Sequence, residues 1–290
     1  LGHAHYLGHE LDMHPGDRYL NVLPFFHIAG YAQSVLMVHY AGSTLCLVDG
    51  FQPEEILRAI TTERITAWAG MPVTVERTLD LARRLGADLS AIRKQHGVSP
   101  ELWDRVARET GATLLTRMYG LTESAGIVSM SPRVERDPQR RRLSVGVPLP
   151  GVEVRIVDPA TQRFLPPREV GEIVFRGWNR FREYYGDPAL TAATIDPEGF
   201  CHTGDLGLID EHGHLHLRGR CKDMVKTGGE NVSPAEVEAW LHAHVSGIKA
   251  VCVVGVPDRI WGEAVTAIVE TEPGARLDAE AVRGQCWGRL

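Results

Sequence analysis

The stretch SPELWDRVARETGATLLTRMYGLTES, residues 99–124, decides the fold class of this chain. Ser99 and Pro100 are typical of a helix start and Gly111 of a helix end, so we expect a helix between them. The following run TLLTRMYG, residues 113–120, is typical of a buried strand. The loop LTES comes directly after it. The segment therefore predicts a helix, a buried strand and then a loop at the carboxyl end of a parallel strand, where ligands bind in open α/β sheets.

The same alternation extends back through the first half of the chain. Apolar runs predict strands at 19–23, 44–48 and 65–69. Helical spacing is present between and after them, at 31–42, 53–64 and 72–86. Alternating strands and helices predict a mainly parallel sheet covered by helices.

The second half follows different patterns. The basic, proline-punctuated stretch 131–142 predicts a solvated surface loop, with phosphate contact as the alternative. Short strands at 152–158, 171–177 and 214–220 predict a small antiparallel barrel or sandwich. In the last part, Ser233, Pro234 and Glu236 form a capping box that predicts a helix over 234–244. Two further apolar runs complete an α+β unit.

Composition restricts the class of protein. The 290 residues suit two domains, and 43% hydrophobic residues suffice for sizeable cores. A net charge of −6 gives no bias toward nucleic acid or an anionic membrane. The five cysteines are scattered and form no C-x-x-C pair, which favours reduced thiols in a cytoplasmic protein. No apolar run reaches the length of a membrane span.

Three loops carry residues suited to chemistry. In MYGLTES, Gly120 permits close backbone approach, the Thr122 hydroxyl suits a phosphate or metal, and the Glu123 carboxylate suits Mg²⁺. In HTGDLG, residues 202–207, Asp205 lies between two glycine turns and suits the hydroxyls of a ribose. In LPFFHIAG, His27 suits the lining of an apolar pocket. Each has a plain alternative: a strand-end turn, a turn-forming aspartate and a core histidine.

Two groups of histidines invite a metal hypothesis. They are His3, His5, His9 and His14, and then His212, His214 and His216. Neither group has the partners of a known zinc arrangement, so we expect these side chains at the surface. His214 and His216 are expected to share one face of a strand.

The order of the motifs resembles one family. LPFFHIAG, YGLTES, SVGVPLPGVEVRIVD, GEIVFRG, YYGDPALTAATI, GFCHTGDLG, GRCKDMVKTGGENVSPAEVE and VVGVPDRIWGEAVTAIV follow one another as in the adenylate-forming enzymes. The resemblance is to the acyl-CoA synthetases, and it covers nearly the entire chain. It implies an α/β fold with a large N-terminal domain of layered parallel sheets, a small β-barrel subdomain and a small mobile α+β C-terminal domain. The implied boundaries are 1–142, 143–221 and 222–290.

The resemblance also implies a reaction. A carboxylic acid reacts with ATP and Mg²⁺ to give acyl-adenylate and pyrophosphate, and the CoA thiol then displaces AMP. By resemblance, Tyr119 stacks on adenine, with Gly120 beside it. Thr122 contacts phosphate and Glu123 holds Mg²⁺. His27 matches a position at the mouth of the acyl pocket.

The remaining roles lie further along the chain. By resemblance, Asp205 binds both ribose hydroxyls with Arg220 beside it, and Lys222 is the hinge of the mobile domain. Lys226 matches a lysine of the thioester-forming step. Gly228 and Gly229 would line the pantetheine tunnel, because a thin arm must pass close to the backbone.

Some features depart from the family pattern. The family's phosphate loop with its lysine would lie upstream of Leu1, and another catalytic lysine would follow Leu290. The segment 88–102 is short and lacks the Gly-Gly-Ala-like turn that frames adenine. Losing one preorganised charged contact lowers the rate of an enzymatic reaction by a factor of about 10²–10³. We therefore expect a polypeptide of this sequence alone to form acyl-adenylate slowly.

Two alternative functions are compatible with the sequence. The first is an amino-acid-activating domain, but the absence of an aspartate near FFHIAG argues against it. The second is a catalytically impaired nucleotide- or acyl-binding protein. The apolar surroundings of His27 favour a fatty or aryl acid over acetate. The expected partners are the small acid, ATP and CoA, without nucleic acid or an integral membrane segment. The oligomeric state stays open, a homodimer included.

Overall fold

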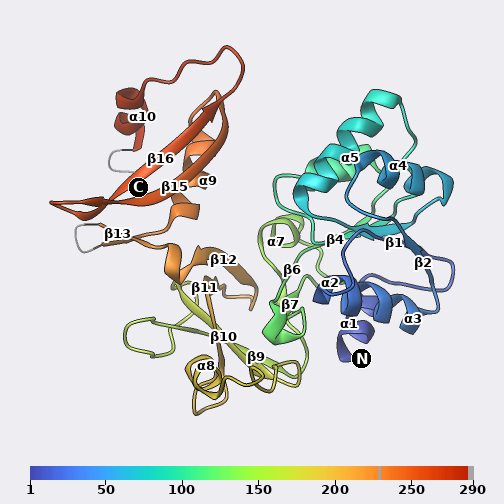
Figure 1. The fold of residues 1–290 in the computed structure, drawn as a ribbon, viewed down its shortest axis with the longest axis horizontal. Coiled ribbons are helices and arrows are strands. Elements are labelled where there is room, and N and C mark those ends of the chain that lie inside the picture. Colours follow the sequence, from blue (N-terminus) through green and yellow to red (C-terminus); the bar gives the residue numbers. More distant parts are fainter. Residues whose placement is uncertain (228–229, 287–290) are drawn as a thin grey trace. The chain divides into compact units, whose positions relative to one another are not determined.

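The structure, a computed structural model, describes residues 1–227 and 230–286 (Figure 1). The chain divides into two compact units. Unit 1 consists of Leu1–Arg155, Val174–Thr203 and Ile209–His216. Unit 2 consists of Ile156–Ile173, Gly204–Leu208 and Leu217–Leu290.

Unit 1 is built on the predicted parallel sheet. Its strands are β1 (Arg18–Asn21), β2 (Thr44–Leu47), β3 (Ala67–Ala69), β4 (Lys94–His96) and β5 (Leu114–Thr116), in the order β2-β1-β3-β4-β5. Each neighbouring pair is parallel. The strand predictions at 19–23, 44–48 and 65–69 are therefore confirmed, and so is the parallel sheet.

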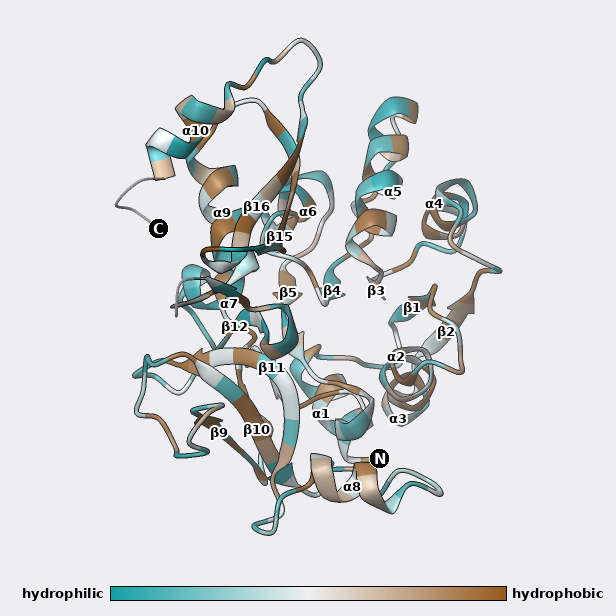
Figure 2. Ribbon diagram, turned by 60° about the vertical axis from the view of Figure 1, so that its left-hand side comes forward, coloured by the Kyte–Doolittle hydropathy of each residue, from teal (hydrophilic) through white to brown (hydrophobic). Residues whose placement is uncertain are grey.

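Helices flank this sheet, and the sequence predicted all of them except the first two, at residues 2–10 and 28–30. They are α1 (Gly2–Glu10), α2 (Ile28–Gly30), the π-helix η1 (Tyr31–Leu36), α3 (Met37–Ala41), α4 (Pro53–Thr62), α5 (Pro72–Leu85) and α6 (Trp103–Glu109). In Figures 1 and 2, α4 and α5 lie on one side of the sheet and α1, α2 and α3 on the other. Both α4 and α5 begin with a proline in the first turn, where no backbone N–H is needed.

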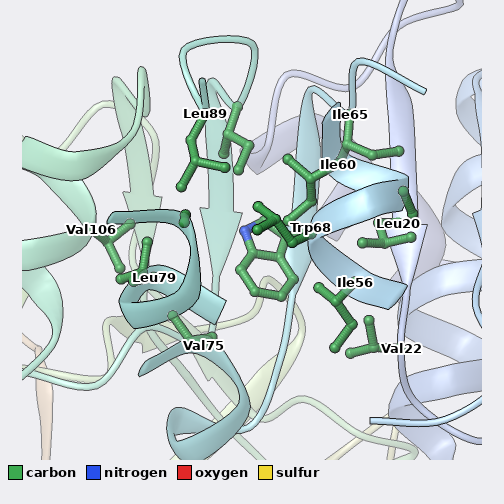
Figure 3. Close-up of a cluster of buried hydrophobic side chains, with 14 of the residues drawn as sticks. Leu20, Val22, Ile56, Ile60, Ile65, Trp68, Val75, Leu79, Leu89 and Val106 are labelled. Atoms are coloured by element: carbon green, nitrogen blue, oxygen red, sulfur yellow. The ribbon is translucent and has the colours of Figure 1, made fainter. Parts of the chain in front are cut away.

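The main core of unit 1 surrounds Trp68 of β3 (Figure 3). Ile56 and Ile60 of α4 and Val75 and Leu79 of α5 point toward its indole. Trp68 is paired in register with Leu20 of β1, and both belong to this cluster. Because side chains alternate along a strand, one face of β1 and β3 is committed to this core.

Strand β4 was not predicted, because its residues Lys94, Gln95 and His96 are polar, yet all three are buried. The Lys94 ammonium makes an ion pair with the fully buried Asp17 carboxylate, which Arg93 also contacts at 2.9 Å. Burial alone raises the pKa of Asp17, but hydrogen bonds from Lys94, Thr66 and the His14 amide bring it below its ordinary value. The segment 88–102, which lacks the family's glycine-rich turn, thus contains a central strand.

The structure of residues 99–124 differs from the prediction in several details. Helix α6 begins at Trp103 after a turn, so Ser99 does not cap it. Gly111 is needed for close packing, since a Cβ there would lie 2.3 Å from the Ser90 carbonyl oxygen. The run 113–120 forms two strands, and only β5 belongs to the parallel sheet.

The second of these strands belongs to a small antiparallel sheet. It consists of β6 (Met118–Tyr119), β7 (Ser129–Met130) and β8 (Val147–Pro148). The loop after Tyr119 therefore follows an antiparallel strand. The prediction that it follows a parallel strand was wrong. The chain passes from one sheet to the other at Arg117.

The basic stretch 131–142 was predicted to be a loop, but its second half is helical. Helix α7 (Pro138–Leu143) starts at Asp137, whose carboxylate accepts from the Gln139 and Arg140 amides. Its arginines contact the protein itself: Arg141 donates to the Leu115 carbonyl at 2.7 Å, and Arg142 pairs with Asp104. The guanidinium groups of Arg141 and Arg142 thus already make polar contacts within the protein.

A four-stranded sheet follows in the chain. Its strands are β9 (Val152–Val157), β10 (Gly171–Gly177), β11 (Cys201–Ile209) and β12 (Leu215–Arg220), in the order β12-β11-β10-β9. Helix α8 (Pro188–Thr194) lies between β10 and β11 in sequence. The first five residues of β10 are buried, and Figure 2 shows hydrophobic colouring along part of this strand.

The last part of unit 2 is an α+β unit, as predicted. It contains the short 3₁₀ helix η3 (Cys221–Asp223), β13 (Val225–Thr227), β14 (Glu230–Val232), α9 (Pro234–His244), β15 (Ile248–Asp258), β16 (Gly262–Thr271) and α10 (Ala279–Cys286). The strand order is β14-β13-β16-β15, and the pairs are antiparallel. Val237 and Leu241 of α9 are buried in its core.

The predicted start of α9 is confirmed, but the predicted side-chain cap is wrong. Ser233 precedes the helix and its carbonyl accepts from the Glu236 amide at 3.1 Å. Its hydroxyl instead donates to the Arg218 carbonyl at 2.7 Å. Ser233 therefore ties the start of α9 to β12.

All five cysteines lie in the described part of the chain, and none of them forms a disulfide bond there. Within residues 1–227 and 230–286, no helix is both long and apolar enough to cross a membrane.

Candidate functional site

The loop after Tyr119 is a tight, internally bonded turn. Thr122–Ser124 form a single 3₁₀ turn, η2, closed by Ala125 at φ 55°. The Ser124 hydroxyl accepts from the Leu121 amide at 3.0 Å. A Cβ at Gly120 would lie 2.3 Å from the Gly126 carbonyl oxygen, so only glycine fits where the two ends of the turn meet.

Side chains from distant segments of unit 1 hold the backbone of this loop. His3 of α1 lies with Nε2 3.1 Å from the Ser124 carbonyl oxygen, and Gln33 of η1 donates to the Gly126 carbonyl at 3.0 Å. Asn179 donates to the Ile127 carbonyl at 2.7 Å. These contacts satisfy buried carbonyls that the turn itself leaves open, and they fix its position relative to α1 and η1.

The prediction that the histidine groups lie at the surface is confirmed for His5, His9, His14 and His212 but is wrong for His3, which is buried. Burial lowers the pKa of His3 below its ordinary value, although the hydrogen bond to Ser124 opposes this shift. His214 is buried as well, with Nε2 3.1 Å from Glu135, and His216 lies 3.0 Å from Asp210. His214 also lies 3.8 Å from Asp210, so the predicted shared face of His214 and His216 is confirmed.

Glu123 is the half-buried carboxylate of the loop. Its carbonyl accepts from the Phe181 amide at 2.7 Å, and its Oε1 accepts from the Tyr184 hydroxyl at 2.6 Å. Among the described residues, no hydrogen bond is found to Oε2. A carboxylate fixed through one oxygen with the other available fits Mg²⁺, which takes one or two carboxylates together with substrate phosphates.

The neighbours of Glu123 differ in exposure. Thr122 is exposed, so its hydroxyl can reach a ligand. The Tyr119 side chain is only 7% exposed, so most of its surface already packs against protein.

His27 lies on the surface at the start of α2. Its Nδ1 accepts from the Ala29 amide at 3.1 Å, which fixes the ring as a helix cap. The adjacent Phe26 is 93% exposed and Phe25 is 48% exposed. The alternative of a buried core histidine is thereby excluded.

Unit 2 carries a second group of predicted residues. Arg220, at the end of β12, pairs through Nε with Asp205 Oδ1 at 2.9 Å. Asp205 lies inside strand β11, with Gly204 at φ 69°, so the prediction of two glycine turns around it was wrong. The Glu172 carboxylate accepts from the Gly204 amide at 2.9 Å. Burial and the charges of Glu172 and Asp205 raise the pKa of Cys221 to about 11, so this thiol stays protonated at neutral pH.

Two predicted lysines follow Arg220. Lys222 is exposed in the middle of η3, the connection between β12 and β13. Lys226 is exposed on β13, and its amide donates to the Glu263 carboxylate at 2.6 Å. Gly228 and Gly229 lie outside the described residues.

The predicted site residues thus form two groups. Unit 1 holds Tyr119, Gly120, Thr122, Glu123 and His27, and unit 2 holds Asp205, Arg220, Lys222 and Lys226. Within the units, the structure brings together Thr122 and Glu123 in one turn, and Asp205 and Arg220 in one ion pair. A cavity of about 590 Å³ in unit 1 is lined by Gly151, Val152, Glu153, Arg176, Gly177, Arg180 and Gly199, none of which was predicted.

Sequence reasoning missed the residues that hold the Glu123 loop, namely His3, Gln33, Asn179 and Tyr184. Tyr184 lies in the motif YYGDPALTAATI that carries the family resemblance, but nothing in that motif indicates which of its two tyrosines bonds to Glu123. The contacts of His3, Gln33 and Asn179 with the loop can be recognised only in the three-dimensional structure.

The chain matches known families and proteins. Residues 2–185 match the family described as AMP-binding enzyme, and residues 236–290 match the AMP-binding enzyme C-terminal domain. A CoA ligase from Mycobacterium tuberculosis, named for a 7a-methyl-1,5-dioxo-octahydro-1H-inden-4-yl propanoyl group, is 38% identical over 92% of this chain and 51% of the relative. A feruloyl-CoA synthase from an Amycolatopsis species is 35% identical over 93% of this chain and 55% of the relative.

A solved structure agrees with the sequence matches. ATP-bound MatB from Rhodopseudomonas palustris is similar with a TM-score of 0.86 and 31% identity, covering 99% of this chain and 56% of that one. The chain spans about half the length of the curated relatives it matches. Because one family match covers more than half of the chain, the chain belongs to the AMP-binding, adenylate-forming enzymes that include the acyl-CoA synthetases.

Proposed function

We propose that this chain serves an ATP-dependent, AMP-forming carboxylate–CoA ligase. The acid reacts with ATP to give acyl-adenylate and pyrophosphate. The CoA thiol then displaces AMP, with loss of the thiol proton, to give the thioester. The observation that carries the proposal is the Glu123 loop, a rigid turn that presents a carboxylate with one oxygen held and the other available. Relatives named as CoA ligases support the same reaction.

The Glu123 loop suits the first half-reaction. The exposed Thr122 hydroxyl can donate to a phosphate oxygen, and Glu123 Oε2 can hold the Mg²⁺ that accompanies ATP. A Mg²⁺ ion bound there would offset negative charge that builds up as pyrophosphate leaves. Because the loop is held by His3, Gln33 and Asn179, these groups need little reorganisation during the reaction, which is the main requirement of electrostatic catalysis.

We assign ribose binding to Asp205. Its Oδ1 is held by Arg220 at 2.9 Å, so the carboxylate is oriented before a ligand arrives. A carboxylate can accept hydrogen bonds from two hydroxyl groups, as acidic residues do in dinucleotide sites. Tyr119, which is 7% exposed, is assigned to adenine.

We assign the second half-reaction to the part of unit 2 that follows β12. Lys222 lies in the four-residue connection 221–224 between two strands, which suits a hinge because few residues must change their dihedral angles. Lys226 is exposed on the strand beyond it and is assigned to the CoA step. The tunnel role of Gly228 and Gly229 stays a prediction.

We infer a fatty or aryl acid as substrate. The observation in favour is the exposure of Phe25 and Phe26 beside His27, which offers apolar surface at the place assigned to the acyl group. Five cysteines that form no disulfide among the described residues favour a reducing compartment such as the cytoplasm.

The test is exchange of labelled pyrophosphate into ATP, run with fatty, aryl and amino acids on the longest product of the gene that encodes this chain. Exchange with a fatty or aryl acid is expected, and added CoA should convert that acid to its thioester. Glu123→Gln should lower the exchange rate by about 10²–10³, because one preorganised charged contact is lost. A folded protein that gives no exchange with any acid would contradict the proposal.

A further inference from the structure

Two adjacent tyrosines near the Glu123 loop differ completely in their surroundings. Tyr184 is partly buried, and its hydroxyl donates to Glu123 Oε1 at 2.6 Å. Tyr185 is 102% exposed. The contact of Tyr184 joins residues 61 positions apart in the sequence, so it is a tertiary contact, and Tyr185 provides a control at the next position.

The backbone around Tyr184 is held on both sides. Its amide donates to the Thr191 hydroxyl at 2.9 Å, and its carbonyl accepts from the Asp187 amide at 3.2 Å. The Phe181 ring packs 4.7 Å from the Tyr184 ring, centroid to centroid. Tyr184 therefore has a fixed position from which to direct its hydroxyl.

The same short segment contacts Glu123 at two points. The Phe181 amide donates to the Glu123 carbonyl, and the Tyr184 hydroxyl donates to its carboxylate. Main chain and side chain of Glu123 are thus both fixed by residues 181–184. A carboxylate held in this way loses its rotamer freedom before a ligand binds, so binding does not have to restrict it.

The direction of the hydrogen bond is also fixed. The Tyr184 hydroxyl is the donor and Glu123 Oε1 is the acceptor, since a hydroxyl has a proton to give and a carboxylate oxygen accepts.

We propose that Tyr184 is a positioning residue that holds Glu123 Oε1 and thereby presents Oε2 alone to a divalent cation. This inference rests on the proposed function, in which Glu123 holds the cation that accompanies ATP. It adds a residue that touches neither substrate nor metal and acts only through Glu123. Without the Tyr184 hydroxyl, the Glu123 carboxylate can rotate. Binding of a cation must then also restrict this rotation, which weakens the binding.

The test compares Tyr184→Phe with Tyr185→Phe. Mn²⁺ binding in the presence of ATP, followed by electron paramagnetic resonance, reports the cation site without requiring turnover. Pyrophosphate exchange at a series of Mg²⁺ concentrations reports its use. Tyr184→Phe should weaken Mn²⁺ binding, and raise the Mg²⁺ concentration for half-maximal exchange, by about tenfold, as expected for one charge-assisted hydrogen bond. Saturating Mg²⁺ should restore most of the rate, and Tyr185→Phe should change neither quantity.

Several outcomes separate positioning from a merely structural role. In a Glu123→Gln background, adding Tyr184→Phe should cause no further loss of Mn²⁺ affinity, because the two residues act as one unit. A Tyr184→Phe protein that melts earlier but needs no more Mg²⁺ or Mn²⁺ than the parent would overturn the inference. If no acid supports exchange but Tyr184→Phe still weakens Mn²⁺ binding, the proposed function fails and the positioning role stands.

Discussion

At the scale of single residues, two glycines of unit 1 share nearly the same backbone conformation. Gly146 has φ 80° and Gly213 has φ 82°, both in the left-handed region. They differ in the space around them. A Cβ on Gly146 would lie 1.9 Å from the carbonyl carbon of Met130, whereas a Cβ on Gly213 would meet no atom within 4 Å. The pair therefore separates backbone strain from steric collision.

We predict that Gly213→Ala costs about 1 kcal/mol of unfolding free energy, the ordinary penalty of a left-handed residue with a side chain. Gly146→Ala should cost a further ~1–3 kcal/mol, because the Met130 backbone must move. Chemical denaturation of the two variants measures both values. Equal losses would mean that the chain around Met130 yields without cost.

Residues of the candidate site were predictable to different degrees. Glu123 and Asp205 could be identified because they lie in short motifs whose order is informative. Tyr184 and His3 could not, because their roles depend on tertiary contacts with Glu123 and Ser124. A single sequence does not show which distant side chain will complete a loop.

At the scale of elements, the strands of the parallel sheet were also predictable to different degrees. Strands β1 and β3 were predicted because they are apolar, but β4 reads Lys-Gln-His. Two of its three polar side chains are tolerated in the interior because they have partners from the β1 region: Asp17 pairs with Lys94, and the Tyr19 hydroxyl lies 2.7 Å from His96 Nε2. The hydrophobic pattern cannot reveal a strand that is buried by pairing.

Strand β4 also predicts a pH dependence of stability. Burial lowers the pKa of His96 from 6.5 to about 4, because the interior disfavours the imidazolium. The unfolded chain therefore binds a proton that the folded chain does not, between pH 6.5 and about 4. The stability due to neutral His96 is fully present above pH 6.5 and is lost as the pH falls through this window. The total loss is roughly 3 kcal/mol.

The measurement is the free energy of unfolding as a function of pH. His96→Gln should lower stability at pH 7 but flatten the profile between pH 6.5 and 4. The exposed His242→Gln serves as control and should keep the slope of the parent protein. An unchanged slope in His96→Gln would show that other groups cause the acid sensitivity.

At the scale of the whole molecule, the predicted site residues lie in both units, and unit 2 holds both the carboxylate assigned to ribose, Asp205, and the lysine assigned to the CoA step, Lys226. The residues assigned to acyl-adenylate formation include Glu123 in unit 1, and those assigned to thioester formation include Lys226 in unit 2. A reaction whose two steps use different parts of the chain should allow one step to be impaired alone. Lys226 is suited to this test because its side chain is exposed and its amide, which any residue supplies, makes the contact with Glu263.

We predict that Lys226→Ala slows formation of the CoA thioester roughly tenfold or more while leaving pyrophosphate exchange within about twofold, because it removes one cation from the second step alone. Lys249→Ala is the matched control. Lys249 is an exposed lysine on β15 of the same unit, paired with Glu270, and its loss should affect neither step. Single-turnover measurements of acyl-adenylate and of thioester separate the two rates. Equal losses in both steps for Lys226→Ala would place Lys226 in adenylation or in folding and would remove its assignment to the CoA step.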